Sequence, residues 1–120
     1  MNFDRIPHLL QRMYQAASEA HSMIEKVDKE AFRQDMVLQR AVGMSLLMAS
    51  EIATQLLTHY PEFTAEHPEF PWEAMRGMRN RIANEYFGID PERVWEAAKN
   101  DVPDLLARLD LVRHWRAEGE

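Results

Sequence analysis

Cysteine is absent from this sequence, and membrane-like apolar stretches are scarce. Without cysteine, disulfides and thiolate metal sites are excluded, which fits a reducing compartment. No cationic start leads into an apolar signal core, and the longest apolar stretch, residues 41–57, is interrupted by Glu51 and Gln55. We therefore expect a cytoplasmic chain with no membrane segment.

Basic charge is also scarce. The 120 residues carry a net charge of −6, which argues against a broad basic surface for nucleic acid, so any RNA contact must be local. The five histidines show no pair at metal-ligand spacing, and the sequence has no glycine-rich phosphate loop and no recognisable catalytic triad. We expect neither a metal site nor a cofactor.

Apolar residues at helical spacing are what the chain has in quantity. An apolar content of 46% over 120 residues suits one compact domain, residues 1–120. A first helix should begin at a cap on Asp4 and run to about Val27. Its buried stripe should consist of Ile6, Leu9, Leu10, Met13, Ala17, Ala20 and Ile24.

A second long helix is predicted over residues 35–59, after a short turn capped by Asp28. It is apolar around most of its circumference, which is typical of a central helix covered by neighbours or by a second subunit. Its core face is expected to be Leu38, Ala41, Ser45, Met48, Ile52 and Leu56. Pro61 and Pro68 predict a connecting loop over residues 60–70.

The remainder of the chain also has the pattern of helices. We expect one over residues 71–87 that Gly88 ends, one over 91–99 capped by Asp90, and a last one that begins at Asp101. No segment shows sustained alternation of apolar and polar residues. The predicted fold is all-α, an antiparallel bundle of four to five helices.

Polar chemistry is concentrated in residues 76–90. On a helix, Arg79 and Tyr86 lie two turns apart at the edge of the core stripe, and Asn80 and Asn84 occupy the adjoining polar flank. A solvated helix face that borders a core would look the same.

Arg76 and Arg81 in this stretch, and Glu51 in the predicted helix over residues 35–59, have two interpretations each. Arg76 and Arg81 could attract an RNA backbone together with Arg79, or could pair with glutamates on their own helix. Glu51 needs a partner if it is buried, and Arg79 is the obvious candidate, while an exposed Glu51 is the alternative.

Several segments resemble the HepT-like branch of the HEPN superfamily. They are Pro71-Trp72, Gly77-Met78-Arg79-Asn80, Tyr86-Phe87-Gly88-Ile89-Asp90, Val94-Trp95 and Asp101-Val102-Pro103. The family signature is an arginine, a polar residue, three further residues, a histidine, one residue and a tyrosine. When the sequence is aligned with this signature, Arg79, Asn80 and Tyr86 match the arginine, the polar residue and the tyrosine, and Asn84 stands at the histidine position.

The resemblance implies a HEPN-like bundle and a metal-independent endoribonuclease toxin that acts as a homodimer. Two signature helices would face each other across an RNA-binding cleft. Arg79 would hold phosphate, Asn80 would orient neighbouring groups, and Tyr86 would contact RNA. The implied partner is an MNT-type nucleotidyltransferase antitoxin that transfers AMP to Tyr86.

Asn84 departs from the family at the residue that should move the proton. An amide cannot exchange a proton near neutral pH, and positioned acid–base catalysis typically contributes ~10² to 10⁴-fold, so we expect this chain to be inactive or weakly active. Either the chain belongs to a silent branch or its histidine was replaced so that a toxic protein could be produced. The alternative function is a non-enzymatic module that binds a nucleotidyltransferase or another protein.

Overall fold

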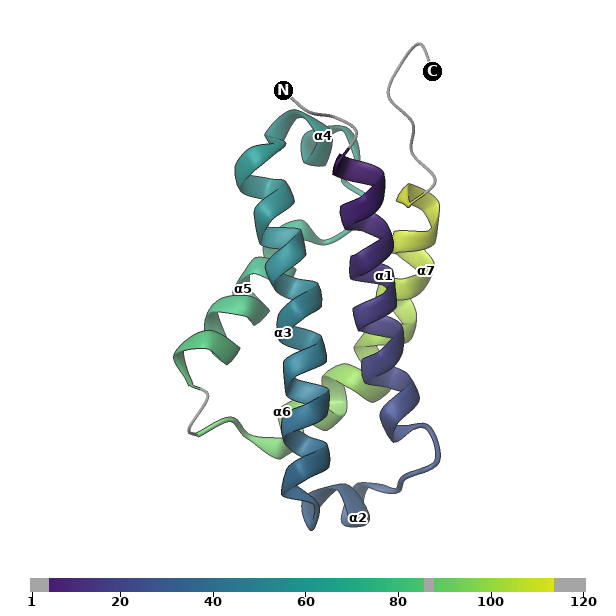
Figure 1. The fold of residues 1–120 in the computed structure, drawn as a ribbon, viewed down its shortest axis with the longest axis vertical. Helices are drawn as coiled ribbons and strands as arrows, with labels where there is room; N and C mark the ends of the chain where they lie inside the picture. Colours follow the sequence, from purple (N-terminus) through teal and green to yellow (C-terminus); the bar gives the residue numbers. More distant parts are fainter. Residues whose placement is uncertain (1–4, 86–87, 114–120) are drawn as a thin grey trace.

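The computed structural model describes residues 5–85 and 88–113, and every regular element in these ranges is helical (Figure 1). In chain order the elements are α1 (Arg5–Ile24), α2 (Lys29–Arg33), α3 (Met36–His59), α4 (Pro61–Glu66), α5 (Trp72–Asn84), α6 (Pro91–Glu96), the π-helical segment η1 (Ala97–Asp101) and α7 (Val102–Val112). The predicted all-α bundle is confirmed.

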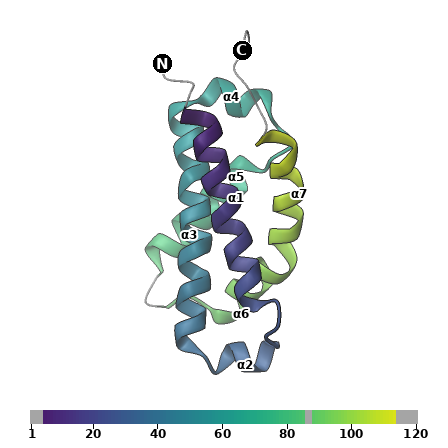
Figure 2. The same ribbon diagram turned by 45° about the vertical axis from the view of Figure 1, so that its right-hand side comes forward.

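Helix α1 packs against both α3 and α7, and α5 lies on the opposite side of α3 from α1 (Figures 1 and 2). The expected stripe of α1 from Ile6 to Ile24 is buried in full, with Ala16 in addition. The helix ends at Ile24 rather than Val27, and the expected cap, Asp4, lies outside the described residues. Helical spacing alone thus identified the core face of α1.

The predicted core face of α3 is only partly right. Ser45 and Leu56 are buried, but Met48 is 46% exposed. The side chains that pack inward are those of Val42, Ser45, Leu46, Ala49, Ser50, Ala53 and Leu56. Because α3 is apolar on several sides, its sequence did not single out one face.

By length and composition α3 could also cross a membrane, and it is the one helix of the described residues that passes this test. The core helix of a soluble protein passes the same test, and 44% of the most apolar window of α3 is buried inside the bundle.

Residues 60–70 contain a helix where a loop was predicted. Pro61 occupies the first turn of α4, where its missing N–H costs no hydrogen bond, and Glu62 follows as a first-turn acid. Phe63 and Thr64 are buried, and the Thr64 hydroxyl donates to the carbonyl of Pro61 at 3.1 Å. The proline we interpreted as a helix breaker is a helix start.

Helix α5 is shorter than predicted at both ends. Pro71 is its N-cap rather than its first helical residue, and the helix ends at Asn84 with Glu85 as C-cap. The Glu85 N–H bonds to the carbonyl of Arg81, and the N–H of Gly88 donates to the Glu85 carbonyl at 2.8 Å. Gly88 therefore follows the end of the helix as part of a turn and is not its C-cap.

The break expected before Asp101 is replaced by continuous helix through η1. Asp101 has helical dihedrals and its side chain caps nothing among the described residues. The Val102 N–H donates to the carbonyl of Ala97, five residues earlier in the chain. In the same pattern the Ala98 carbonyl would accept from residue 103, but this residue is Pro103, which has no N–H. The His21 ring supplies the missing donor, with Nδ1 2.9 Å from the Ala98 oxygen.

Asp28 and Asp90 cap helices as predicted, and Asp35, at the predicted start of the second long helix, is a cap as well. The Asp28 carboxylate accepts from the Ala31 N–H at 2.7 Å, that of Asp35 from the Leu38 N–H at 3.0 Å, and that of Asp90 from the Glu92 N–H at 3.0 Å. These bonds satisfy N–H groups that the first helical turn leaves free.

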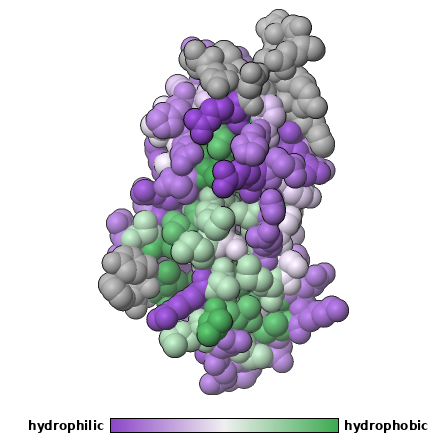
Figure 3. All heavy atoms as spheres, viewed as in Figure 1, coloured by the Kyte–Doolittle hydropathy of each residue, from purple (hydrophilic) through white to green (hydrophobic). Residues whose placement is uncertain are grey.

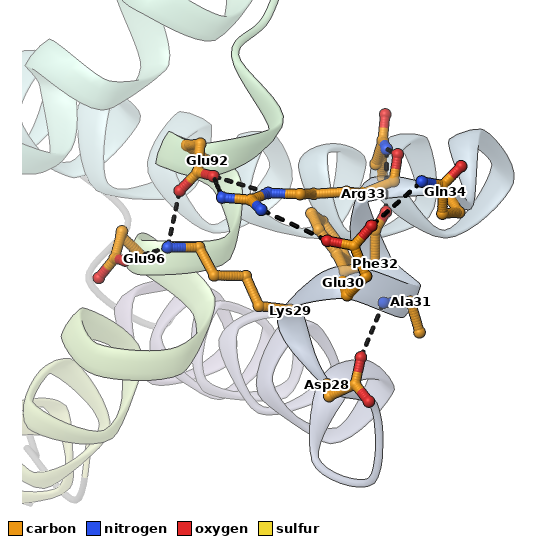
Figure 4. A network of polar contacts seen from close by, with 10 residues as sticks. Asp28, Lys29, Glu30, Ala31, Phe32, Arg33, Gln34, Glu92 and Glu96 are labelled. Carbon is orange, nitrogen blue, oxygen red and sulfur yellow. Dashed lines mark hydrogen bonds and ion pairs between the residues drawn. The ribbon is translucent and has the colours of Figure 1, made fainter.

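A polar network joins α2 to α6 (Figure 4). Glu92 accepts from Lys29 Nζ at 2.8 Å and from Arg33 Nε at 2.8 Å, and Arg33 also contacts Glu30. The hydrogen bonds from Lys29 and Arg33 hold the pKa of the Glu92 carboxyl below its ordinary value. Ionised Glu92 therefore contributes to the α2–α6 contact, which also includes the rings of Phe32 and Trp95.

Replacing Glu92 with glutamine should lower the Tm at neutral pH. The pKa of Glu92 is lower in the folded than in the unfolded chain, so its contribution is present above the unfolded-state pKa and is lost as pH falls through the folded-state pKa. Thermal melts of wild type and Glu92→Gln should converge over that interval. Glu96→Gln, which removes a carboxylate 3.5 Å from Lys29, is the control and should lower the Tm by less than Glu92→Gln does. Equal melting of Glu92→Gln and wild type at pH 7 would contradict the assignment.

Candidate functional site

Helix α5 docks on α3 through one apolar face, and this docking sets where its polar residues lie. Met75 is buried, and Met78 and Ile82 pack partly buried against the core. Arg79 consequently lies at the border of that face, while Asn80 and Asn84 are exposed. The predicted division of this helix into a core stripe and a polar flank is confirmed for the residues described.

Arg79 is held by Glu51 across the α3–α5 contact. Its Nε donates to Glu51 Oε1 at 3.0 Å, and its Nη1 donates to Asn80 Oδ1 at 3.1 Å. The predicted pairing of Glu51 with Arg79 is confirmed. An arginine fork has five N–H donors, so these two bonds orient the guanidinium and leave donors for an anion.

The other two arginines of α5 differ in their surroundings. Arg76 pairs with Glu73 on the same helix, which agrees with the second of its two interpretations, a pair with a glutamate of its own helix. Arg81 forms no ion pair with a described residue; its Nη1 lies 3.5 Å from where a Cβ on Gly77 would be. A Cβ at that distance would make an ordinary van der Waals contact. An interior glycine often marks a place where another backbone comes close, but no backbone of the described residues approaches Gly77 in this way. Tyr86 lies outside the described residues.

A hollow of about 540 Å³ opens beside Arg79, between α1, α3 and α5. We call it the arginine groove. It is lined by Arg5, Leu9, Arg12, Leu47, Met48, Glu51, Ile52, Gln55, Arg79 and Ala83. Three arginines against one glutamate give this lining a formal charge of +2, in a chain whose net charge is −6.

Two residues of the groove were missed in the sequence. Arg5 and Arg12 lie on α1, more than 60 positions before Arg79 in the chain, and only the packing of α1 on α3 brings them to the same hollow. Their spacing of seven residues, which puts both on one side of a helix, was the available signal. Nothing in the sequence indicated that this side faces α5.

The described residues contain no group of three or more His, Asp or Glu side chains able to hold a metal ion. The chemistry available at the groove is therefore that of arginine, carboxylate and amide groups. The arginine and amide groups can bind and orient a phosphate.

Comparison with known proteins agrees with this architecture. Residues 13–112 match the family model "Ribonuclease HepT-like". The chain is 30% identical over 97 residues to "Probable ribonuclease HepT" of Thermococcus cleftensis, covering 80% of this chain and 88% of that protein. It is 34% identical over 104 residues to a candidate RNase of Caldanaerobacter subterraneus subsp. tengcongensis, covering 83% of each chain. No solved structure matches significantly.

The helical bundle is thus of the HEPN superfamily type. Within that superfamily, the chain belongs to the HepT-like ribonuclease family.

Removing the Glu51 carboxylate should free Arg79 at little cost in stability. Both side chains are more than a third exposed, and such pairs typically contribute ~0.2 to 1 kcal/mol, so Glu51→Ala should lower the free energy of unfolding by no more than about 1 kcal/mol. Exchange of the Arg79 Nε–H with water, measured by NMR, should accelerate because its acceptor is gone.

Glu73→Ala is the matched control, since it breaks a comparable surface pair with Arg76. It should leave the Arg79 signal unchanged. An Arg79 exchange rate that is the same in Glu51→Ala and wild type would contradict the role assigned to Glu51.

Proposed function

We propose that this chain is the toxin component of a cytosolic HEPN/MNT toxin–antitoxin pair, an endoribonuclease scaffold in which Asn84 has removed most of the activity. The observation that carries the proposal is the oriented Arg79, fixed by Glu51 at the edge of a hollow of positive formal charge. Membership of the HepT-like ribonuclease family supports RNA as the substrate class.

The proposed reaction is attack by an RNA 2′-hydroxyl on the adjacent phosphorus, with departure of the 5′-oxygen. It needs a base for the hydroxyl proton, an acid for the leaving oxygen and positive charge at the phosphate. Arg79 meets the third need, with Asn80 bonded to its Nη1 as an orienting group. Asn84 follows Asn80 by one helical turn, where a histidine would supply proton transfer.

Restoring that histidine should restore cleavage. Asn84→His should cut single-stranded RNA ~10² to 10⁴ times faster than the chain with Asn84, because positioned acid–base catalysis contributes that range. Cleavage should persist in EDTA, and production of the variant without a partner should arrest growth. Gel analysis of end-labelled RNA gives the rates.

The control is Asn84→His combined with Arg79→Ala, which keeps the histidine and removes the phosphate contact. It should lose the restored activity. An Asn84→His protein as inert as the chain with Asn84 would favour the second candidate function, a non-enzymatic module that binds a nucleotidyltransferase, to which asparagine at this position also points.

Neutralisation would act through Tyr86. In the proposed reaction its phenol oxygen forms a bond to the α-phosphorus of ATP, pyrophosphate leaves, and the phenol proton passes to a base of the nucleotidyltransferase. Incubation with a cognate MNT-type nucleotidyltransferase and ATP should add the mass of AMP to the chain. Tyr86→Phe should abolish this addition and Tyr14→Phe should not. An unmodified wild-type chain in the presence of the correct partner would remove the antitoxin mechanism.

Homodimerisation is part of the same proposal, and the exposed side of α3 supports it. Met36, Val37, Met44 and Met48 are 58%, 77%, 56% and 46% exposed, and Figure 3 shows apolar side chains gathered over this part of the molecule. Apolar patches of this kind mark interaction surfaces in soluble proteins. The patch adjoins the arginine groove, since Met48 lines it, so a partner copy there would extend the cleft.

Charge placed in this patch should therefore separate the subunits. Met44→Glu combined with Met48→Glu should sediment as a monomer, because a carboxylate is costly to bury without a partner. Leu111→Glu, at a leucine that is 74% exposed on α7, is the control and should keep the wild-type mass. A wild-type chain that is monomeric at all accessible concentrations would contradict the dimer.

A further inference from the structure

We propose that Arg5 and Arg12 of α1 form a second phosphate-binding site, along which an extended single strand of RNA continues from Arg79. The inference rests on the proposed function and adds to it a binding element outside the α5 motif. The observation behind it is that α1 and α5 both line the arginine groove, so that Arg5 and Arg12 lie in the same hollow as Arg79.

The spacing of the two residues suits a polymer. Arg5 and Arg12 are seven residues apart on a continuous helix, which places them ~10 Å apart along its axis. Two arginines at that separation of their backbones, with a third on α5, can each contact a different phosphate of one strand. They match a ligand that carries a negative charge at each of several successive units.

Both arginines have their charge available. Arg33, Arg76, Arg108 and Arg113 each form an ion pair with a glutamate or aspartate, but Arg5 and Arg12 form none with any described residue. Both are exposed, so they can reach a phosphate without losing a partner among residues 5–85 and 88–113. In a chain of net charge −6, two such arginines in one groove give a local positive charge that can attract a phosphate.

The rest of the lining suits nucleotides as well. Leu9, Met48 and Ile52 give the groove an apolar wall on which bases or riboses can pack, and Gln55 offers an amide that can donate and accept hydrogen bonds. A positively charged groove that follows the backbone is one of the means by which proteins hold single strands without sequence preference.

Salt-dependent binding is the measurement that isolates phosphate contacts. Fluorescence anisotropy of a labelled single-stranded RNA of mixed sequence would be followed over a KCl series with the full chain. Each phosphate contact on a single strand contributes ~0.7 to the slope of log K against log salt concentration. Arg5→Gln with Arg12→Gln should reduce the magnitude of that slope by ~1.4 per chain that contacts the RNA.

Two further double variants serve as controls. Arg5→Lys with Arg12→Lys keeps the charge and should keep the slope. Lys26→Gln with Lys99→Gln removes two charges that do not line the groove and should leave the slope near that of wild type. Circular dichroism of all variants checks that the helices are retained.

The possible results separate this inference from the proposed function. An unchanged slope for the Arg5/Arg12 glutamine variant, with RNA bound by wild type and cleaved by Asn84→His, overturns the inference alone. An unchanged slope combined with slower AMP transfer to Tyr86 overturns it in favour of a contact with the nucleotidyltransferase. A wild-type chain that binds no RNA, together with an Asn84→His form that cleaves none, removes both.

Discussion

The packing of α1 and α5 on opposite sides of α3 is the interaction on which the rest of the structure depends. Small residues on α3, among them Ala49, Ser50 and Ala53, are fully or almost fully buried and allow neighbouring helices to approach closely. Glu51 is next to them in the sequence, so it lies beside a tight contact. The register of α5 on α3 therefore determines whether Glu51 and Arg79 can meet.

Two kinds of residue could be predicted from the sequence. Where a helix is apolar on one side only, as α1 is, spacing identified every buried residue of the expected stripe. The caps Asp28 and Asp90 were also assigned correctly, because their bonds involve residues two or three positions away. The Glu51–Arg79 pair was one of two interpretations of Glu51, and the structure shows it with both side chains more than a third exposed.

What could not be predicted depends on contacts distant in the chain or on the context of a proline. The inward face of α3 is chosen by its neighbours, and α4 forms because Phe63 finds a buried site beside Trp72. The arginine groove is the clearest case. Arg5 and Arg12 contribute to it from α1. The sequence of α1 alone indicates only that they lie on a polar, solvated side of the helix.

The η1 segment has a consequence for the tautomer of His21. A carbonyl oxygen can only accept, so the bond between His21 Nδ1 and Ala98 requires a hydrogen on Nδ1. Of the two neutral tautomers of histidine, only the one protonated on Nδ1 can make this bond. The constraint falls on the tautomer: the neutral ring is fixed with Nε2 as its acceptor, and α1 is joined to η1 at the one carbonyl that Pro103 cannot serve.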